Sequence, residues 1–216
     1  MIVIEKSNQK GKRYQVVTST GEKLRFTQET VFKYSIFTGT EFTEEEWLNI
    51  LQDTLEEECF HKILSYQSVR AHSTREVRNK LIKKNFPKLI IDRALDRVQS
   101  LGLLDDAVFA KLFVEEKLSY GNGRNKVKSE LFKRGVDKEI IKEAFEHFEN
   151  HSDFETQEEI LFTHAKRKWQ QLEREKDPYK RKQKLLAFLA NRGFSAEESY
   201  RALDHCSNDY CDEDYW

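Results

Sequence analysis

The sequence has 216 residues, of which 38% are hydrophobic and 35% are charged, and its formal net charge of −1 hides a strong segregation of acids and bases along the chain. This length and this hydrophobic fraction suit one large or two modest domains with a buried core, and two prolines and eight glycines suit a helical body. No run approaches the roughly 18 apolar residues of a membrane span, the start is too soon charged for a secretory signal, and three cysteines without disulfide spacing favour a cytoplasmic protein.

Residues 1–40 differ from the rest of the chain. Short runs of β-prone residues lie at 2–4, 14–17 and 24–26, and residues 19–22 make a plausible hairpin turn between the last two. Thr27 is placed to cap a short helix around residues 30–37. We therefore predict a small β-containing N-terminal domain.

Helices follow, each with a recognisable start. Thr43 with Glu46, Ser73 with Glu76, and Ser195 with Glu198 have capping-box spacing, Asp105 is a simple N-cap, and both prolines are expected at first helical positions. A helix with Trp47, Leu48, Leu51 and Leu55 on one face is expected after Thr43. The later helices are predicted at residues 54–69, 73–84, 87–100, 105–119, 123–134, 137–149, 153–176, 178–191 and 195–206.

One pattern occurs three times. A helix-spaced apolar run ends in a basic residue, a Gly or Asn, and an apolar residue, and the copies are Lys84-Asn85-Phe86, Arg134-Gly135-Val136 and Arg192-Gly193-Phe194. Gly, and less readily Asn, adopts the left-handed conformation that ends a helix. Such a period indicates stacked supersecondary units. The predicted fold is mainly α, with tandem three-helix repeats in a curved right- or left-handed array behind the β-containing domain. The predicted boundaries are 1–52, 53–104, 105–150, 151–206 and an acidic tail at 207–216.

Bases gather in three bands, one in each repeat. Residues 70–84 carry six bases against one acid, residues 124–134 five against one, and residues 166–184 nine against three. Solvated helix faces explain some of these charges, but three bands on a neutral chain favour contact with a polyanion or an acidic partner. The candidate binding residues are Arg75, Arg78, Lys83, Lys84, Arg124, Lys126, Lys128, Lys133, Arg134, Lys166, Arg167, Lys168, Lys182, Lys184 and Arg192.

Sites for other chemistry are weak. Asp105 and Asp106 could form a carboxylate pair, but a helix cap is the simpler interpretation. The Gly-rich loop at residues 120–124 lacks a complete phosphate-binding motif, so a turn is favoured, although Arg124 could still touch a phosphate there. His205, Cys206 and Cys211 have no fourth metal ligand at a sensible spacing. We predict no catalytic site, no metal and no cofactor.

Three segments resemble the RecX family of bacterial proteins that regulate the recombinase RecA. They are LLDDAVFA at 103–110, GNGRNKVKSELFKRGV at 121–136 and NRGFSAEESYRAL at 191–203. The resemblance runs from about residue 59 to residue 206, and residues 1–50 resemble an extension of longer members. Asn85 departs from the Gly of the other two turns.

The resemblance implies a function in DNA repair, recombination and the SOS response. A family member would bind the RecA–single-stranded DNA filament, lie in its groove as a monomer, and limit filament growth or promote disassembly. Three alternatives remain at this point: a regulator that reads duplex DNA, a metal-dependent nuclease using Asp105 and Asp106, and a helical scaffold without nucleic acid. Changing Arg124, Lys128 and Arg134 together to Glu is expected to abolish inhibition and leave folding intact.

Overall fold

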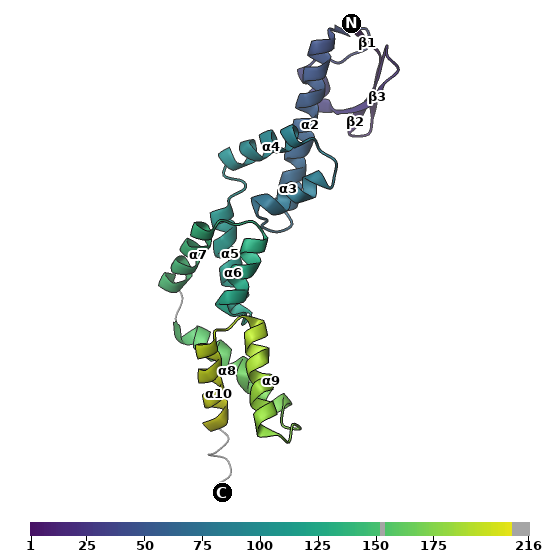
Figure 1. The fold of residues 1–216 in the computed structure, drawn as a ribbon. Coiled ribbons are helices and arrows are strands. Elements are labelled where there is room, and N and C mark those ends of the chain that lie inside the picture. The colour runs from purple at the N-terminus through teal and green to yellow at the C-terminus, as the bar shows by residue number, and fades with distance from the viewer. Residues whose placement is uncertain (152–153, 209–216) are drawn as a thin grey trace. The chain divides into compact units, whose positions relative to one another are not determined.

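The structure is a computed structural model that describes residues 1–151 and 154–208. Over these residues it contains ten helices and one four-stranded antiparallel sheet (Figure 1). Contacts divide the chain into two compact units, the first comprising residues 1–70 and 77–104 and the second comprising residues 71–76 and the chain from residue 105. The predicted fold class, a mainly helical chain of three-helix repeats behind a small sheet, is confirmed.

The N-terminal sheet has the order β3-β2-β1-β4, with β1 (Ile2–Lys10), β2 (Arg13–Thr18), β3 (Lys23–Thr27) and β4 (Glu41–Phe42). The expected hairpin joins β2 and β3, and Thr27 caps the short helix α1 (Gln28–Lys33). The sequence did not predict β4, a strand of two residues. Ile4, Phe26 and Trp47 bury their side chains in the core beneath this sheet.

Helix α2 (Glu44–Gln67) is longer than either helix expected there, because the two are continuous. Its Thr43–Glu46 capping box is present, and the helix runs without a break through residue 52, where a domain boundary was predicted. Of the four residues predicted to share one face, Trp47 is buried in the sheet core and Leu51 packs against that core, whereas Leu48 and Leu55 are exposed. Further along, Cys59 and Ile63 enter the core of the first repeat.

The remaining eight helices match the predicted ones to within a few residues at most ends. They are α3 (Thr74–Ile82), α4 (Lys88–Ser100), α5 (Asp106–Ser119), α6 (Arg124–Lys133), α7 (Lys138–His151), α8 (Phe154–Gln171), α9 (Pro178–Arg192) and α10 (Ala196–Asn208). Helix α8 ends at Gln171 rather than 176, so the longer spacing of the third repeat lies in the connection to α9. Pro178 is the first residue of its helix, but Pro87 caps α4 from outside. Residues 209–216, which hold most of the predicted acidic tail and Cys211, lie outside the described residues.

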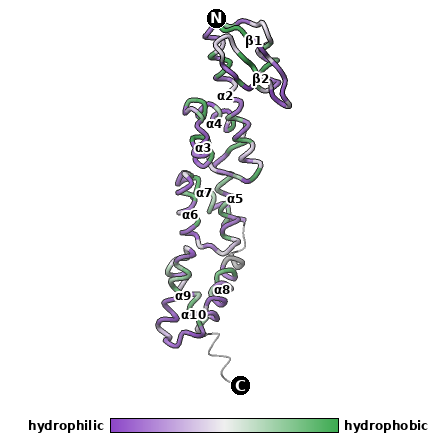
Figure 2. Tube along the Cα trace, turned by 90° about the vertical axis from the view of Figure 1, so that its right-hand side faces the viewer, coloured by the Kyte–Doolittle hydropathy of each residue, from purple (hydrophilic) through white to green (hydrophobic). Residues whose placement is uncertain are grey.

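Each repeat has its own apolar core, and hydrophobic segments alternate with hydrophilic ones along its helices (Figure 2). The turn after the second helix of each repeat is left-handed, as predicted, with φ of 62° at Asn85, 78° at Gly135 and 90° at Gly193. The turns at Arg134–Gly135 and Arg192–Gly193 also make hydrogen bonds beyond their own repeats.

Candidate nucleic-acid interface

The Arg192–Gly193 turn joins the third repeat to the second. The backbone N–H of Gly123 donates to the carbonyl of Arg192 at 2.7 Å, and the N–H of Asn125 donates to the carbonyl of Gly193 at 3.1 Å. The unpaired carbonyls at the end of α9 thus satisfy the unpaired N–H groups at the start of α6, and the two helix dipoles align head to tail. Helices α9 and α6 consequently follow one another end to end in both views (Figures 1 and 2).

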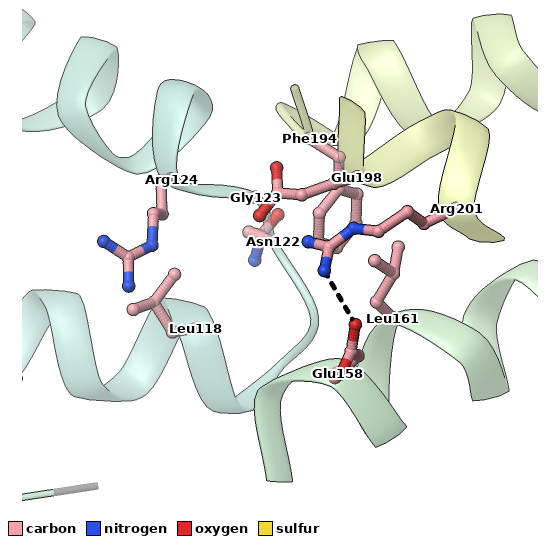
Figure 3. Close-up of a pocket in the computed structure, with 9 residues that line it drawn as sticks. All are labelled: Leu118, Asn122, Gly123, Arg124, Glu158, Leu161, Phe194, Glu198 and Arg201. Carbon is pink, nitrogen blue, oxygen red and sulfur yellow. Dashed lines mark hydrogen bonds and ion pairs between the residues drawn. The ribbon is translucent and has the colours of Figure 1, made fainter. Parts of the chain in front are cut away.

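Two predicted binding residues are part of this joint. The guanidinium of Arg192 donates to the carbonyl of Gly121 at 2.9 Å and lies over the ring of Phe188. Lys126 is half-buried and packs against Gly193. A β-carbon added to Gly193 would lie only 2.3 Å from the Cβ of Lys126. The neighbouring cavity holds only about 50 Å³, and Arg201 pairs with Glu158 at 3.0 Å across it (Figure 3). The joint is packed shut and offers no small-molecule site.

The Arg134–Gly135 turn makes the equivalent joint with residues 71–76 of the second unit. The hydroxyl of Ser73 donates to the carbonyl of Arg134 at 2.7 Å, and the Arg134 guanidinium pairs with Glu76 and lies over the ring of Phe113. The stem of Arg75 covers Gly135. Arg75, Lys126, Arg134 and Arg192 are therefore structural residues of the joints, whatever else they contact.

A second group of candidates is paired with carboxylates. Arg78 pairs with Asp92, Arg124 with Glu149, and Lys184 with Glu175. The pKa of the Glu175 carboxyl is lowered below its ordinary value, and the hydrogen bond from Lys184 is the largest cause. These pairs are partly exposed, so each contributes little to stability and can be exchanged for a better anionic partner.

The third group is mostly exposed. Lys168 is half-buried over the ring of Phe188 at 5.5 Å, and the others have exposed side chains. The exposed candidates are Lys83, Lys84, Lys128, Lys133, Lys166, Arg167 and Lys182. Lys83 and Lys133 occupy equivalent positions in the first and second repeats.

The structure confirms that the loop before α6 is a turn, as favoured, and corrects the prediction made for the triple charge reversal that includes Arg134. The start of α6 is not open to phosphate, because the carbonyls of Arg192 and Gly193 already occupy two of its N–H donors. Changing Arg134 to Glu would place a second carboxylate beside Glu76, so the triple charge reversal would not leave the fold intact.

Asp105 and Asp106 serve the backbone. Asp105 caps α5 by accepting from Ala107 at 2.6 Å and Val108 at 3.2 Å, and Asp106 accepts from the N–H of Thr74 at 2.8 Å. Within residues 1–151 and 154–208, no group of three His, Cys, Asp or Glu side chains is placed to hold a metal ion. No helix in the described part of the chain is long and apolar enough to cross a membrane.

The thiol of Cys59 is fully buried, and burial raises its pKa to about 11, with a further contribution from Glu56. A thiol with so high a pKa is a poor nucleophile at neutral pH. Cys206 is likewise buried, in the core of the third repeat.

Comparison with known proteins agrees with the repeat structure. Family models described as the first, second and third three-helix domains of RecX match residues 59–97, 105–144 and 155–203. The chain is 36% identical over 155 residues to the regulatory protein RecX of Chlorobium phaeobacteroides (strain BS1), covering 71% of this chain and 97% of that protein. It is 26% identical over 206 residues to the regulatory protein RecX of Clostridioides difficile (strain 630), covering 95% and 94%.

Two solved structures share the fold. One, described as a crystal structure of regulatory protein RecX, superposes with a TM-score of 0.70 at 19% identity and covers 94% of this chain and all of its own. The other, of RecX from Lactobacillus salivarius, gives a TM-score of 0.60 at 19% identity and covers 71% of this chain and 97% of its own.

Proposed function

The chain belongs to the RecX family of regulatory proteins, and on that basis we propose that it binds the RecA–single-stranded DNA filament and inhibits recombinase activity. It acts as a cytoplasmic monomer without a cofactor or a catalytic site, by lying in the filament groove and limiting growth or promoting disassembly. The observation that carries the proposal is the set of exposed cations that the repeats present, led by the equivalent residues Lys83 and Lys133.

The joints support this proposal because they fix the spacing of the cations in the second unit. Helices α9 and α6 are joined end to end by backbone hydrogen bonds, so Lys182 on α9 and Lys133 on α6 lie on consecutive helices of one stack. A nucleoprotein filament offers phosphates and acidic protein surface at regular intervals. Weak contacts that are held at fixed intervals combine through effective concentration, and so a rigid spacing raises the affinity of the whole surface.

The chemistry of the exposed group also suits phosphate. Most of its members are lysines, whose compact ammonium groups bind phosphate as point charges without demanding one geometry. Such contacts release condensed counterions, so binding weakens steeply as salt rises. Binding through phosphates also carries no base preference, which suits a partner that coats DNA of any sequence.

Paired charge reversals test the proposal. One variant combines Lys83→Glu with Lys84→Glu, and a second combines Lys133→Glu with Lys182→Glu. A matched control combines Lys10→Glu, at the end of β1, with Lys12→Glu, in the turn that follows, and both positions are exposed. All three change the net charge equally. We expect each of the first two to weaken inhibition of filament-dependent ATP hydrolysis about tenfold or more, and the control to inhibit like the unaltered protein.

Three outcomes would contradict the proposal. Equal inhibition by all variants would remove these cations from the interface. Tight, sequence-dependent binding to naked duplex DNA, with no effect of the recombinase, would favour the duplex-binding regulator. Cleavage of labelled DNA during long incubation with magnesium or manganese would show a nuclease.

A further inference from the structure

The second repeat has an apolar groove between α6 and α7. The groove has a volume of about 650 Å³, and it is lined by the buried residues Ile141 and Phe145. Phe132 also lines it, and 68% of this side chain is exposed to solvent. A large exposed aromatic side chain beside an open apolar groove is a feature of protein-binding surfaces.

Comparison with the first repeat explains why this groove is open. Arg78 and Asp92 of the first repeat form an ion pair that links α3 to α4. The equivalent positions in the second repeat, 50 residues later, hold Lys128 and Lys142. Two ammonium groups repel each other and cannot form such a link, so nothing equivalent bridges α6 and α7 at this position.

The two lysines also determine which partner fits. Lys128 lies over the ring of Phe145 at 5.1 Å, and Lys142 makes only a long, exposed contact of 3.6 Å with Glu146 on its own helix. Both are available to carboxylates that enter with an apolar segment. The other lining charges are nearly balanced, since Arg124 pairs with Glu149 while Lys138 stands beside Glu139. The apolar lining of Phe132, Ile141 and Phe145 gives a phosphate chain nothing to bind, whereas apolar side chains of a protein segment fit it, so a protein segment is the favoured occupant.

We propose that the α6–α7 groove docks an amphipathic helix of a protein partner, with apolar residues on one face and carboxylates beside them. The helix places its apolar face on Phe132, Ile141 and Phe145, and its carboxylates reach Lys128 and Lys142. This is the helix-in-groove mode of recognition, in which anchors at every third or fourth residue enter the groove. The inference does not depend on the proposed filament binding, because it needs neither DNA nor the recombinase.

Synthetic peptides of about 18 residues test the inference on the full-length protein. The first has leucines at helical spacing on one face and glutamates beside them, the second replaces the glutamates with lysines, and the third keeps the glutamates but replaces the leucines with glutamine. Binding is followed by fluorescence anisotropy and mapped by amide chemical shifts. We expect the first peptide to bind about five- to tenfold more tightly than the second and the third not to bind, with shifts confined to α6 and α7.

Two variants of the protein sharpen the test. Phe132→Ser removes an exposed anchor and is expected to weaken binding about tenfold with little change in stability. Lys142→Asp recreates the charges of the Arg78–Asp92 pair, so it is expected to bridge the groove and block the peptide while Phe132 stays in place. Ile82→Ser, at the position of the first repeat equivalent to Phe132 and 54% exposed, is the matched control and should change nothing.

Several results would overturn the inference. No binding of the first peptide, or equal binding of the glutamate and lysine peptides, would remove the acidic helix as the occupant. Binding that survives both Phe132→Ser and Lys142→Asp would place the peptide elsewhere. A thymidine oligonucleotide that shifts the same amides and displaces the peptide would assign the groove to the nucleic-acid surface. None of these results bears on the charge reversals at Lys83, Lys84, Lys133 and Lys182, which lie outside the groove lining, so the two proposals fail separately.

Discussion

Adding one methyl group at Gly123 tests whether the repeats are joined as described. The backbone of Gly123 has φ −75° and ψ 155°, which any residue adopts, so Gly is not required there by conformation. A β-carbon would nevertheless lie 2.2 Å from the carbonyl carbon of Gly193 and 2.2 Å from the nitrogen of Phe194. Ordinary contact begins near about 3.5 Å, so the two backbones must separate by about 1 Å.

This separation sets the size of the effect. It breaks or lengthens the hydrogen bonds from Gly123 to Arg192 at 2.7 Å and from Asn125 to Gly193 at 3.1 Å, each of which contributes about 1 kcal/mol. Overpacking against backbone adds a cost of about 1–3 kcal/mol. We therefore expect Gly123→Ala to lower the free energy of unfolding of the second unit by about 3–5 kcal/mol in chemical denaturation. Hydrogen exchange at the Asn125 amide should accelerate in parallel.

Two further substitutions act as controls for the joint. Ser73, at the position equivalent to Gly123, shows how a side chain can be accommodated, because its hydroxyl donates to the carbonyl of Arg134. Gly123→Ser should therefore be milder than Gly123→Ala. Gly102→Ala, where φ is 67° and the β-carbon meets nothing within 4 Å, should cost only the left-handed strain of about 1–2 kcal/mol and leave Asn125 protected. Unchanged stability and unchanged Asn125 exchange in Gly123→Ala would refute the joint.

Two other predictions concern charges in these joints. Burial first, and then Arg192 and Arg167, lower the pKa of His164 below its ordinary value of 6.5, so the unfolded chain binds the proton more readily. The stability that this neutral imidazole permits is complete above pH 6.5 and falls as pH drops through the lowered pKa. In thermal unfolding, His164→Gln should therefore lose less stability between neutral and mildly acidic pH than the unaltered protein loses. Arg134→Met removes both the ion pair with Glu76 and the guanidinium that lies over the Phe113 ring, and denaturation should show a loss of about 1–3 kcal/mol, against less than about 0.5 kcal/mol for the equivalent exposed change Lys84→Met. Equal pH profiles in the first case, or equal losses in the second, would contradict these assignments.

The repeat architecture was predictable because local signals set the helix ends. Thr43 and Asp105 cap helices as predicted, Pro178 begins its helix, and Asn85 takes the left-handed conformation that its side chain tolerates. The continuity of α2 was not predictable. Its first half packs in the sheet core and its second half in the core of the first repeat, and no helix-breaking residue separates the two. Strand β4 was missed because two residues carry no periodicity, and their pairing depends on β1 far away in sequence.

The candidate surface was predictable only in part. The basic bands made Lys83 and Lys133 candidates, and the structure exposes both. The sequence did not reveal that Arg134 and Arg192 close the joints, because their partners, Glu76 and Gly121, lie 58 and 71 residues away in the chain. The open groove was also missed. Aligning Arg78 and Asp92 with their lysine counterparts would have shown where a linking ion pair is lost.

The salt dependence of filament binding tests the central claim most directly. The measurement is the slope of log Kd against log salt concentration for the unaltered protein and for a variant with Lys83, Lys84, Lys133 and Lys182 all changed to Glu. If these lysines contact phosphate, the slope of the variant is shallower by up to about four and the affinity at low salt falls steeply. Parallel slopes with equal affinities, in two proteins that are folded alike, would contradict the account.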